Sequence, residues 1–379
     1  MRTTIHLEIS SARRARIFRS LATTTAFINA LGTAVPGHDV HRAFIGWAER
    51  QIGESRARMA FVRMAERSGI AHRWSVLARA GADKTGSPIE PGGFYHGEAP
   101  GTGARMLAYG EAAPPLALKA VEQLRERAPL GAISHLLVAS CTGFVAPGID
   151  QIIAARLGLG GDVERTLIGF MGCYAAVSAL RLAHHLVRSE PRARVLVINV
   201  ELSTLHLQAS ADIESLLAML QFGDGASAAL VTAEPSGLAI GRPFAATLDR
   251  SSELIRWSIG DTGFAMQLSG EVPGRIAAAL RNPEIRGRIL GGDQPGDFDA
   301  WAIHAGGRSV LDAVEKGFGL PQHALAASRS VLARFGNMSS ATLPFVLADL
   351  LDDPSARRGI ALAFGPGLAA EGFEFSRDL

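Results

Sequence analysis

The chain has 379 residues, 47% hydrophobic and 20% charged, so it is long enough for two domains or one large fold and lacks the composition of a disordered protein. Its 38 basic and 36 acidic residues give a net charge of +2, which argues against nucleic acid as a partner. Only two cysteines occur, Cys141 and Cys173, which excludes a disulfide scaffold or a multi-cysteine zinc site and favours a cytoplasmic location.

The N-terminus is basic and contains no apolar signal-peptide core, so we expect no secretion signal. Residues 1–21 are predicted to form an N-terminal extension before the fold begins. The most apolar run, residues 167–180, is shorter than the roughly 20 residues that a membrane-spanning helix needs. No integral membrane segment is therefore predicted.

Apolar β-type segments alternate with helical segments along the rest of the chain, a pattern typical of an α/β protein. Strands are predicted at residues 135–140, 195–201, 226–232, 300–304 and 360–364. Helices are predicted at residues 115–127, 150–157, 175–188, 308–316 and 339–351. Residues 81–105, rich in Gly and Pro, are expected to form a long loop.

Cys173 stands at the predicted start of a helix, in the sequence Gly-Phe-Met-Gly-Cys-Tyr-Ala-Ala. The free N–H groups and positive dipole end of a helix N-terminus favour a thiolate, the nucleophile that acyl transfer from a thioester requires. A buried cysteine acting only as a small hydrophobic residue is equally compatible with this segment. The same ambiguity holds for Cys141, for which a place in a cavity wall is favoured over nucleophilic attack.

His304 follows a predicted strand and precedes two glycines and a helix, while Asn337 stands near the start of the last predicted helix. Asn at such a position is often only a helix cap. Together, however, the imidazole and the amide could stabilise the enolate formed when a malonyl thioester loses CO2, and His304 could pair with a Cys173 thiolate. No histidine spacing suggests a metal site. Cys173 and His304 each lie between a strand and a helix, which hints at a duplicated fold.

Five motifs, in their order and spacing, resemble those of the chalcone and stilbene synthase superfamily, the type III polyketide synthases. They are Gly-Cys173-Tyr-Ala-Ala, Phe222-Gly-Asp-Gly-Ala, Ile-His304-Ala-Gly-Gly, Phe-Gly-Asn337-Met-Ser-Ser-Ala and Phe-Gly365-Pro366-Gly367-Leu. The resemblance implies a five-layered αβαβα thiolase fold with two similar halves. Residues 22–235 would form the half with the nucleophilic Cys, and residues 236–379 the half with His and Asn. It also implies a homodimer.

The resemblance assigns Cys173, His304 and Asn337 as the catalytic triad and Phe222 as an aromatic gate between a CoA tunnel and an internal cavity. It places further residues at the gate or cavity wall: Trp257, Met266, Cys141, Thr142, His206, Gly365, Pro366 and Gly367. It assigns Arg63, Arg67 and Ser309 to CoA binding, where guanidinium groups suit phosphate. Trp257 stands where plant enzymes carry glycine and Met266 where they carry a second phenylalanine, so we expect a reshaped cavity.

The expected activity is iterative condensation of malonyl-CoA onto an acyl-CoA starter bound to Cys173, followed by cyclisation to a pyrone or a resorcinol- or phloroglucinol-type product. CoA thioesters are the substrates, and no cofactor is expected. Two alternatives stay open. One is a single-round enzyme similar to β-ketoacyl-ACP synthase III; the other is a non-catalytic thiolase-fold partner that binds acyl-CoA.

Overall fold

The computed structural model describes residues 24–81, 86–248 and 251–377. The predicted N-terminal extension lies outside these residues, and the first strand, β1, spans Ala26–Ala34. Within the described ranges, no helix is long and apolar enough to cross a membrane.

In the described chain, nine strands form one mixed sheet that consists of two similar parts. The first part follows the order β1, β7 (Asp224–Thr232), β6 (Val195–Leu202), β4 (His135–Ser140) and β5 (Glu164–Gly169). The second follows the order β8 (Leu238–Thr247), β13 (Ala369–Ser376), β12 (Arg358–Gly365) and β11 (Ala300–Ile303).

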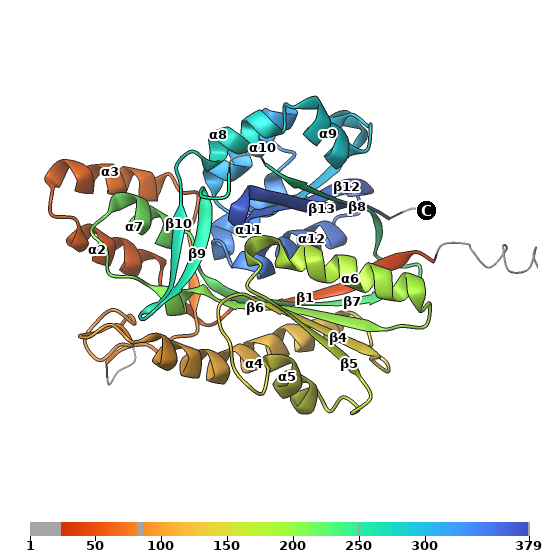
Figure 1. The fold of residues 1–379 in the computed structure, drawn as a ribbon, viewed down its shortest axis with the longest axis horizontal. Helices are drawn as coiled ribbons and strands as arrows, with labels where there is room; N and C mark the ends of the chain where they lie inside the picture. Colours follow the sequence, from red (N-terminus) through yellow and green to blue (C-terminus); the bar gives the residue numbers. More distant parts are fainter. Residues whose placement is uncertain (1–23, 82–85, 249–250, 378–379) are drawn as a thin grey trace, which may run out of the picture.

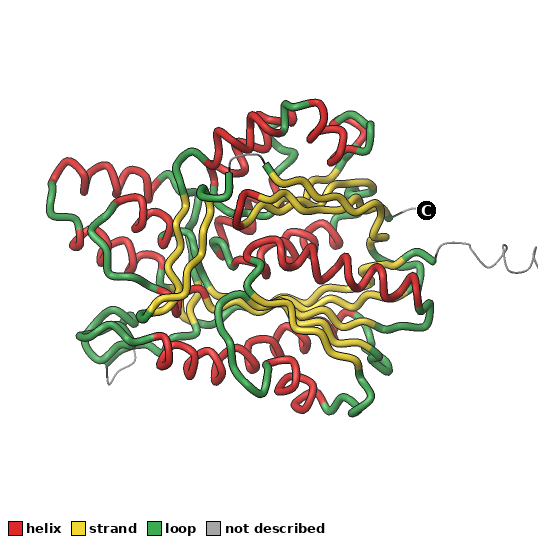
Figure 2. Tube along the Cα trace, viewed as in Figure 1, coloured by secondary structure: helices red, strands yellow, loops and turns green. Residues whose placement is uncertain are grey.

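The two parts share their strand directions as well as their order. In each, the first strand is antiparallel to the second, the second is antiparallel to the third, and the third is parallel to the fourth. The parts are joined where β1 pairs with β8, over Ala26, Phe27 and Ile28 only. The sheet therefore divides at this joint, and the two parts face each other across a layer of helices (Figure 2).

Helices complete five layers around the two parts of the sheet (Figure 1). Between the parts lie α6 (Ala175–Ser189) and α12 (Thr342–Asp352). On the outer side of the first part lie α4 (Thr102–Arg127) and α5 (Ile149–Leu157). Three helices lie on the outer side of the second part: α8 (Val272–Ala279), α9 (Pro283–Leu290) and α10 (Arg308–Phe318). The predicted αβαβα fold with two similar halves is thus confirmed.

The inner strands are rich in apolar residues on both sides because helices cover both faces of the sheet. Strands β4, β6 and β7 are buried along their whole lengths, as expected for strands with no solvent-facing side. One core lies between the two parts of the sheet, and two others lie beneath the outer helices. Burial in all three cores ties the layers together through the hydrophobic effect.

A smaller lobe lies beside these layers, at the left in Figure 1. It contains α2 (His41–Gln51), α3 (Ser55–Glu66) and α7 (Ile213–Met219), which share an apolar core around Phe44 and Phe61. Two small two-stranded antiparallel sheets adjoin it. One pairs β2 (His38–Asp39) with β3 (Trp74–Ser75), and the other is the hairpin of β9 (Ile255–Gly260) and β10 (Gly263–Leu268). The remaining long helix, α11 (Ala326–Phe335), packs against α12.

The five predicted strands and five predicted helices are present, with one large boundary error. Helix α4 begins at Thr102 rather than at residue 115, so the predicted loop at residues 81–105 ends sooner. Proline usually marks a helix start, but Pro114 and Pro115 both lie inside α4. Side chains on either side of them, including Tyr109 and Leu124, are buried in one continuous apolar face that holds the helix to β1.

The sequence suggested that Cys173 and His304 occupy equivalent positions in the two halves, but the structure relates other residues. Strand β4 corresponds to β11, so Cys141, directly after β4, corresponds to His304, directly after β11. The turn at Cys173 precedes α6 and β6, and the turn after Asn337 precedes α12 and β12. Cys173 and Asn337 are therefore at the related helix starts, whereas Cys173 and His304 are not equivalent.

Candidate active site

Cys173 lies in a one-turn 3₁₀ helix, η1 (Gly172–Tyr174), between the end of β5 and the start of α6. Gly172 has φ +77°, and a Cβ atom there would lie 2.4 Å from Cδ of Pro366, in the turn that follows β12. Only glycine permits this close approach of the second half to the nucleophile turn. Cys173 itself is 8% exposed.

His304 follows β11, and its backbone N–H donates to the carbonyl of Leu362 in β12. The ring is 2% exposed, and neither of its nitrogens has a hydrogen-bond partner among the described residues. Gly306 lies against the ring, because a Cβ at Gly306 would be 3.5 Å from Nε2 of His304. The imidazole is thus held by strand and loop, and neither nitrogen is engaged by another described group.

The Asn337 amide is oriented by its own turn. Its Oδ1 accepts a hydrogen bond of 2.9 Å from the N–H of Ser339, so the carbonyl end is occupied by the start of the 3₁₀ helix η4 (Ser339–Ala341). Its Nδ2 donates to the carbonyl of Gly306 at 3.2 Å, beside His304. One N–H of this group remains for another acceptor. The same side chain therefore accepts a hydrogen bond within its own turn and donates one beside His304.

Cys173, His304 and Asn337 line one small cavity of about 40 Å³. The remaining wall is almost wholly apolar and comes from both halves and the hairpin: Phe222, Ile255, Met266, Leu268, Val272, Ile276, Gly306, Val310, Phe364 and Gly365. We name this cavity the catalytic pocket. In it, water is largely excluded around a nucleophile and two nitrogen groups, so electrostatic interactions are strong.

Burial controls the protonation of the pair. It raises the pKa of the Cys173 thiol to about 12, although the side chains of Ser339 and Asn337 act in the opposite direction. Desolvation lowers the pKa of His304 to about 3. A helix N-terminus contributes about 0.3–1 kcal/mol, less than one pKa unit, so it does not outweigh burial. Both shifts favour a neutral thiol and a neutral imidazole over the ion pair that the sequence suggested.

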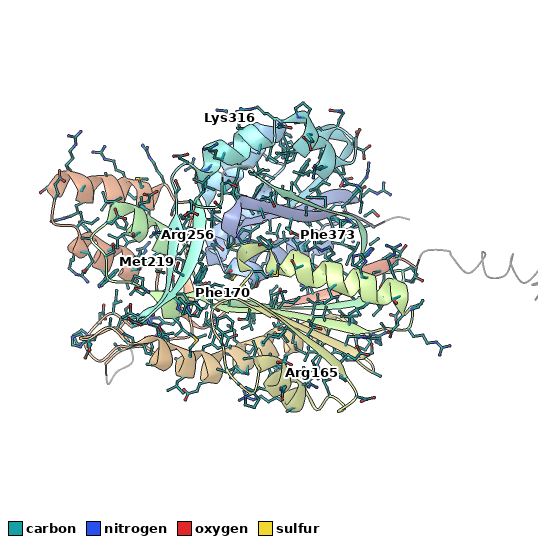
Figure 3. The ribbon with its side chains drawn as sticks, viewed as in Figure 1. Arg165, Phe170, Met219, Arg256, Lys316 and Phe373 are labelled. Carbon is teal, nitrogen blue, oxygen red and sulfur yellow. The ribbon has the colours of Figure 1, made fainter. Side chains whose placement is uncertain are left out.

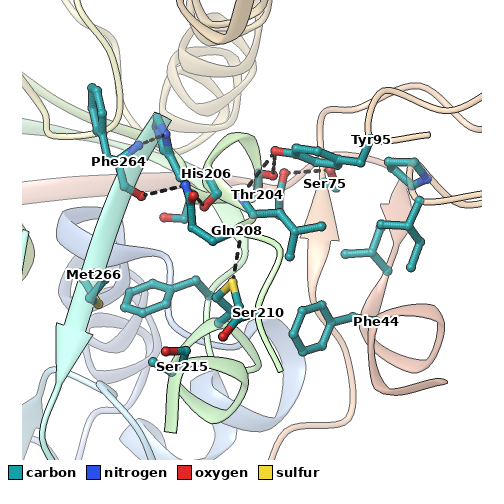
Figure 4. A pocket seen from close by; sticks show the side chains of 18 of the residues that line it. Phe44, Ser75, Tyr95, Thr204, His206, Gln208, Ser210, Ser215, Phe264 and Met266 are labelled. Atoms are coloured by element: carbon teal, nitrogen blue, oxygen red, sulfur yellow. Dashed lines mark hydrogen bonds between the residues drawn. The ribbon is translucent and has the colours of Figure 1, made fainter. Parts of the chain in front are cut away.

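Phe222 and Met266 line the catalytic pocket on one side and a second, larger cavity on the other. This second cavity, which we name the side pocket, has a volume of about 350 Å³ (Figure 4). Phe222 is held beside Asn337, since the two residues form a β-bridge and Gly223 N–H donates to the Asn337 carbonyl. Trp257 packs edge-on against Phe222, with ring centroids 6.3 Å apart, and lines the side pocket only.

His206 lines the side pocket, but both of its ring nitrogens are occupied. Nε2 lies 2.7 Å from the Thr142 carbonyl, and Nδ1 accepts from the Phe264 N–H at 3.0 Å. These contacts require a proton on Nε2 and none on Nδ1. Desolvation lowers the pKa of His206 to about 4. The residue therefore offers a ligand its ring surface and not a proton.

Cys141 and Thr142 line neither cavity and lie beneath the nucleophile turn instead. The Gly172 N–H donates to Cys141 Sγ at 3.1 Å, and burial raises the pKa of this thiol well above its usual value. Thr142 Oγ1 donates to Glu201 at 2.9 Å and accepts from the Leu202 N–H. Both side chains support the site without facing a cavity.

Glu201 and Ser339 are two site residues that the sequence reasoning missed. Glu201, fully buried in β6, accepts hydrogen bonds from the Cys141 N–H, from Thr142 and from the Ser340 hydroxyl. These bonds connect the two halves of the chain. Burial raises the pKa of Glu201 to about 7. A glutamate within a buried, mostly apolar strand was the available signal. Ser339 has φ +48°, a backbone conformation that the sequence does not reveal.

Of the Gly365–Gly367 turn, only Gly365 lines the catalytic pocket. Pro366 packs on Gly172, and Gly367 lies apart, with its carbonyl accepting a hydrogen bond from Ser251.

The residues predicted to contact CoA are exposed. Arg63 lies on α3, Arg67 follows its end, and Ser309 lies in the first turn of α10.

Arg67 and Ser309 lie near each other, because Arg308 Nη1 donates to the Arg67 carbonyl at 3.2 Å. Among the described residues, no cluster of three or more His, Cys, Asp or Glu side chains is placed to hold a metal.

Two family models together match nearly the whole chain. The model for the N-terminal domain of chalcone and stilbene synthases matches residues 12–235, and that for the C-terminal domain matches residues 244–376.

Several named proteins are similar along most of their length. The alpha-pyrone synthesis polyketide synthase-like Pks18 of Mycobacterium tuberculosis is 34% identical over 284 residues, 72% of each chain. The bisdemethoxycurcumin synthase of Oryza sativa is 32% identical over 303 residues, 73% of this chain and 74% of the relative. The solved structure of PKS-I from the brown alga Ectocarpus siliculosus has a TM-score of 0.84 at 28% identity, covering 93% of this chain and 98% of that one.

The protonation of Cys173 can be measured by its alkylation with iodoacetamide, which requires the thiolate. Because burial raises the pKa of Cys173 to about 12, we expect the rate to increase about tenfold per pH unit between pH 6 and pH 9, without a plateau. Peptide mass spectrometry separates this site from Cys141. A rate already constant above pH 6 would indicate a resting thiolate–imidazolium pair and contradict the expectation.

Proposed function

Since this chain belongs to the family of chalcone and stilbene synthases, we propose that Cys173 is its acyl-carrying nucleophile and that His304 and Asn337 are its decarboxylation and oxyanion donors. As a member of that family, the chain is a type III polyketide synthase, an acyltransferase that condenses acyl units iteratively. The family uses CoA thioesters as substrates. The observation that carries the proposal is the enclosure of these three side chains in one apolar pocket.

In the first step, Cys173 attacks the thioester carbonyl of a starter acyl-CoA. The neutral imidazole of His304 accepts the thiol proton, and the departing CoA thiolate receives it. An acyl thioester on Cys173 and free CoA result. Because burial disfavours the thiolate, proton transfer accompanies the attack rather than preceding it.

In the second step, malonyl-CoA loses CO2, and the electron pair of the broken C–C bond forms an enolate. The free N–H of Asn337 Nδ2 and a ring N–H of His304 donate to the enolate oxygen, where charge develops. The enolate carbon attacks the acyl thioester, a C–C bond forms, and the Cys173 thiolate leaves and takes up a proton from the medium. The chain, now two carbons longer on CoA, can return to Cys173 for another round.

For the starter we propose a fatty acyl-CoA, and for the product a pyrone or a resorcinol- or phloroglucinol-type ring. The apolar wall of the side pocket supports an acyl chain as occupant. The similar protein Pks18 carries alpha-pyrone synthesis in its name. A cytoplasmic location, suggested by the two unpaired cysteines, stays a prediction.

The proposed function is tested by mass spectrometry of the products from purified enzyme, malonyl-CoA and acyl-CoA starters from acetyl to palmitoyl. We expect pyrones or resorcinols that contain two or more malonyl-derived units. Cys173→Ala should abolish product, while Asn337→Ala should keep acylation of Cys173 but lower malonyl decarboxylation by about 100-fold or more, as loss of one oxyanion donor does elsewhere.

A single β-ketoacyl product from malonyl-ACP, with none from malonyl-CoA, would instead indicate the single-round condensing enzyme. Absence of any acyl adduct on Cys173 would indicate the non-catalytic acyl-CoA-binding alternative.

Trp257 bears on product size, because its indole packs against Phe222 and fills part of the side pocket. Trp257→Gly should enlarge the cavity and shift the products toward more extensions or longer starters. Trp257→Phe, which keeps an aromatic ring, is the matched control and should shift them less. The measurement is the mass distribution of products at equal conversion; an unchanged distribution in Trp257→Gly would contradict this role.

We also propose that the chain forms a homodimer through the edge of β5. This strand ends the sheet, and its outer edge has no partner strand among the described residues. Large apolar side chains are exposed at or beside it: Leu167 by 44%, Phe144 by 44% and Phe170 by 38% (Figure 3 labels Phe170). Phe144 and Phe170 contact each other, with centroids 5.8 Å apart. An exposed apolar patch on an open strand edge is typical of an association surface.

Sedimentation equilibrium tests this interface. We expect the wild-type chain to have the mass of a dimer and Leu167→Glu to shift it toward the monomer. Met59→Glu, which changes a similarly exposed side chain on α3, is the control and should leave the mass unchanged. A wild-type monomer, or a Leu167→Glu protein that stays dimeric, would contradict the proposal.

A further inference from the structure

The hairpin of β9 and β10 forms a wall of both cavities, yet it stands apart from the main sheet. Within the described chain its two strands pair only with each other. Met266 lines both cavities, and Trp257 and Phe264 line the side pocket (Figure 4 labels Phe264 and Met266). Arg256 and Ser258, which alternate with these residues, are exposed. The position of the hairpin therefore sets the dimensions of both cavities.

Hydrogen bonds attach the hairpin to other segments of the described chain only near its tip. Every such bond from residues 255–268 involves residues 260–264. The partners come from two segments. One is the start of α4, and the other is the 3₁₀ helix η2 (Ser203–His206) with the residues that follow it. Because a two-stranded hairpin is marginally stable by itself, these attachments determine where its strands lie.

Thr102, the first residue of α4, makes three hydrogen bonds to the tip. Its N–H donates to the Asp261 carbonyl at 2.8 Å. Its hydroxyl donates to the Gly260 carbonyl and accepts from the Gly263 N–H at 2.8 Å. Since Gly260 ends β9 and Gly263 begins β10, this one hydroxyl holds both strands.

The second segment holds the same end of the hairpin. Nδ1 of His206 accepts from the Phe264 N–H at 3.0 Å, and Gln208 Nε2 donates to the Thr262 carbonyl at 2.9 Å. The tip is thus attached on two sides, by α4 and by the chain that follows β6.

Arg105 connects these two segments. It is fully buried; its Nε donates to the Pro100 carbonyl at 2.8 Å, and its Nη1 donates to the carbonyls of Leu205 and Leu207 at 2.8 and 2.9 Å. The hairpin packs directly on this side chain, because a Cβ at Gly263 would lie 2.7 Å from Arg105 Cδ. Gly263 also has φ +97°, so both the turn and the packing require glycine.

The charge of Arg105 is buried without a carboxylate partner among the described residues. Desolvation lowers its pKa, and the one charge interaction that opposes this shift is with Tyr95, whose ring centroid lies 5.2 Å from Cζ. Burying a charge in this way is costly. An apolar side chain could fill the space without that cost, but it could not bind three carbonyls from separate segments. The fork of the guanidinium group suits this task.

We propose that Thr102 and Arg105 are positioning residues that limit the number of extensions, because they fix the hairpin and with it the space open to the growing chain. This inference rests on the proposed function, in which Trp257 of the same hairpin bears on product size. Neither Thr102 nor Arg105 lines the catalytic pocket or the side pocket. They therefore act on product length through the hairpin and not on the reacting atoms.

The test compares Thr102→Val, which keeps the shape but removes the hydroxyl, with Thr102→Ser, which keeps the hydroxyl. With acetyl-CoA and malonyl-CoA, the fraction of products longer than the main wild-type product should rise about threefold or more in Thr102→Val, since two hydrogen bonds are lost. Thr102→Ser should match the wild type. Acylation of Cys173 by acetyl-CoA should be unchanged in both variants.

Hydrogen exchange followed by mass spectrometry reports on the hairpin without any substrate. Peptides that cover residues 255–268 should exchange about tenfold faster in Thr102→Val than in the wild type or Thr102→Ser, because local opening becomes easier. Residues 195–202 of β6 are the internal control and should not change. Arg105→Lys keeps the charge but not the fork, so it should show both effects of Thr102→Val. If Arg105→Lys does not fold, the Thr102 pair decides the inference.

Three results would overturn the inference. They are unchanged product lengths in Thr102→Val, the same change in Thr102→Ser as in Thr102→Val, or a loss of Cys173 acylation in Thr102→Val that equals its loss of product. Failure of the proposed function looks different: the wild-type chain itself would then condense no malonyl-CoA and carry no acyl group on Cys173, whatever the exchange rate of the hairpin.

Discussion

The active site depends on the close crossing of two helix starts, one from each half of the chain. The turn at Cys173 rests on β12 of the second half, and the turn after Asn337 rests on β6 of the first. Gly172 allows the first contact, because any side chain there would collide with Pro366. Glu201 supports the second by accepting from Ser340 across the junction and from Cys141 and Thr142 on its own side. Neither half alone contains both the nucleophile and the two donor groups.

The same crossing removes the reacting groups from water, and this sets their chemistry. Burial opposes charge on both Cys173 and His304 and so favours the neutral form of the site, in which charge develops as the thioester reacts. Asn337 is a neutral donor whose direction is set by the hydrogen bond that its Oδ1 accepts from the Ser339 N–H. Donors fixed in advance and shielded from water stabilise an enolate oxygen without reorganising. The apolar wall around them continues past Phe222 into the side pocket.

The sequence predicted well those elements whose signals are local. Strand β4 has the predicted bounds, because an apolar run between turn residues can be recognised without knowing which strands pair with it. Strand β5 was missed: its residues are mostly exposed, so they carry no apolar pattern. The start of α4 was misplaced, since tertiary packing carries the helix through Pro114 and Pro115. For the site, the motifs predicted that Cys173, His304 and Asn337 would meet. They could not reveal that Cys141 lies beneath the nucleophile turn, or that Arg105 connects the two segments that hold the hairpin, because both depend on contacts between distant segments.

The central claim is that, of the two buried cysteines, only Cys173 accepts an acyl group from CoA. It is tested most directly by incubating the enzyme with an acyl-CoA in the absence of malonyl-CoA, digesting it, and mapping thioester adducts by peptide mass spectrometry. The account predicts one acyl adduct per chain, on Cys173, with Cys141 unmodified, and loss of the adduct in Cys173→Ser. An adduct on Cys141, or none on either cysteine, would contradict it.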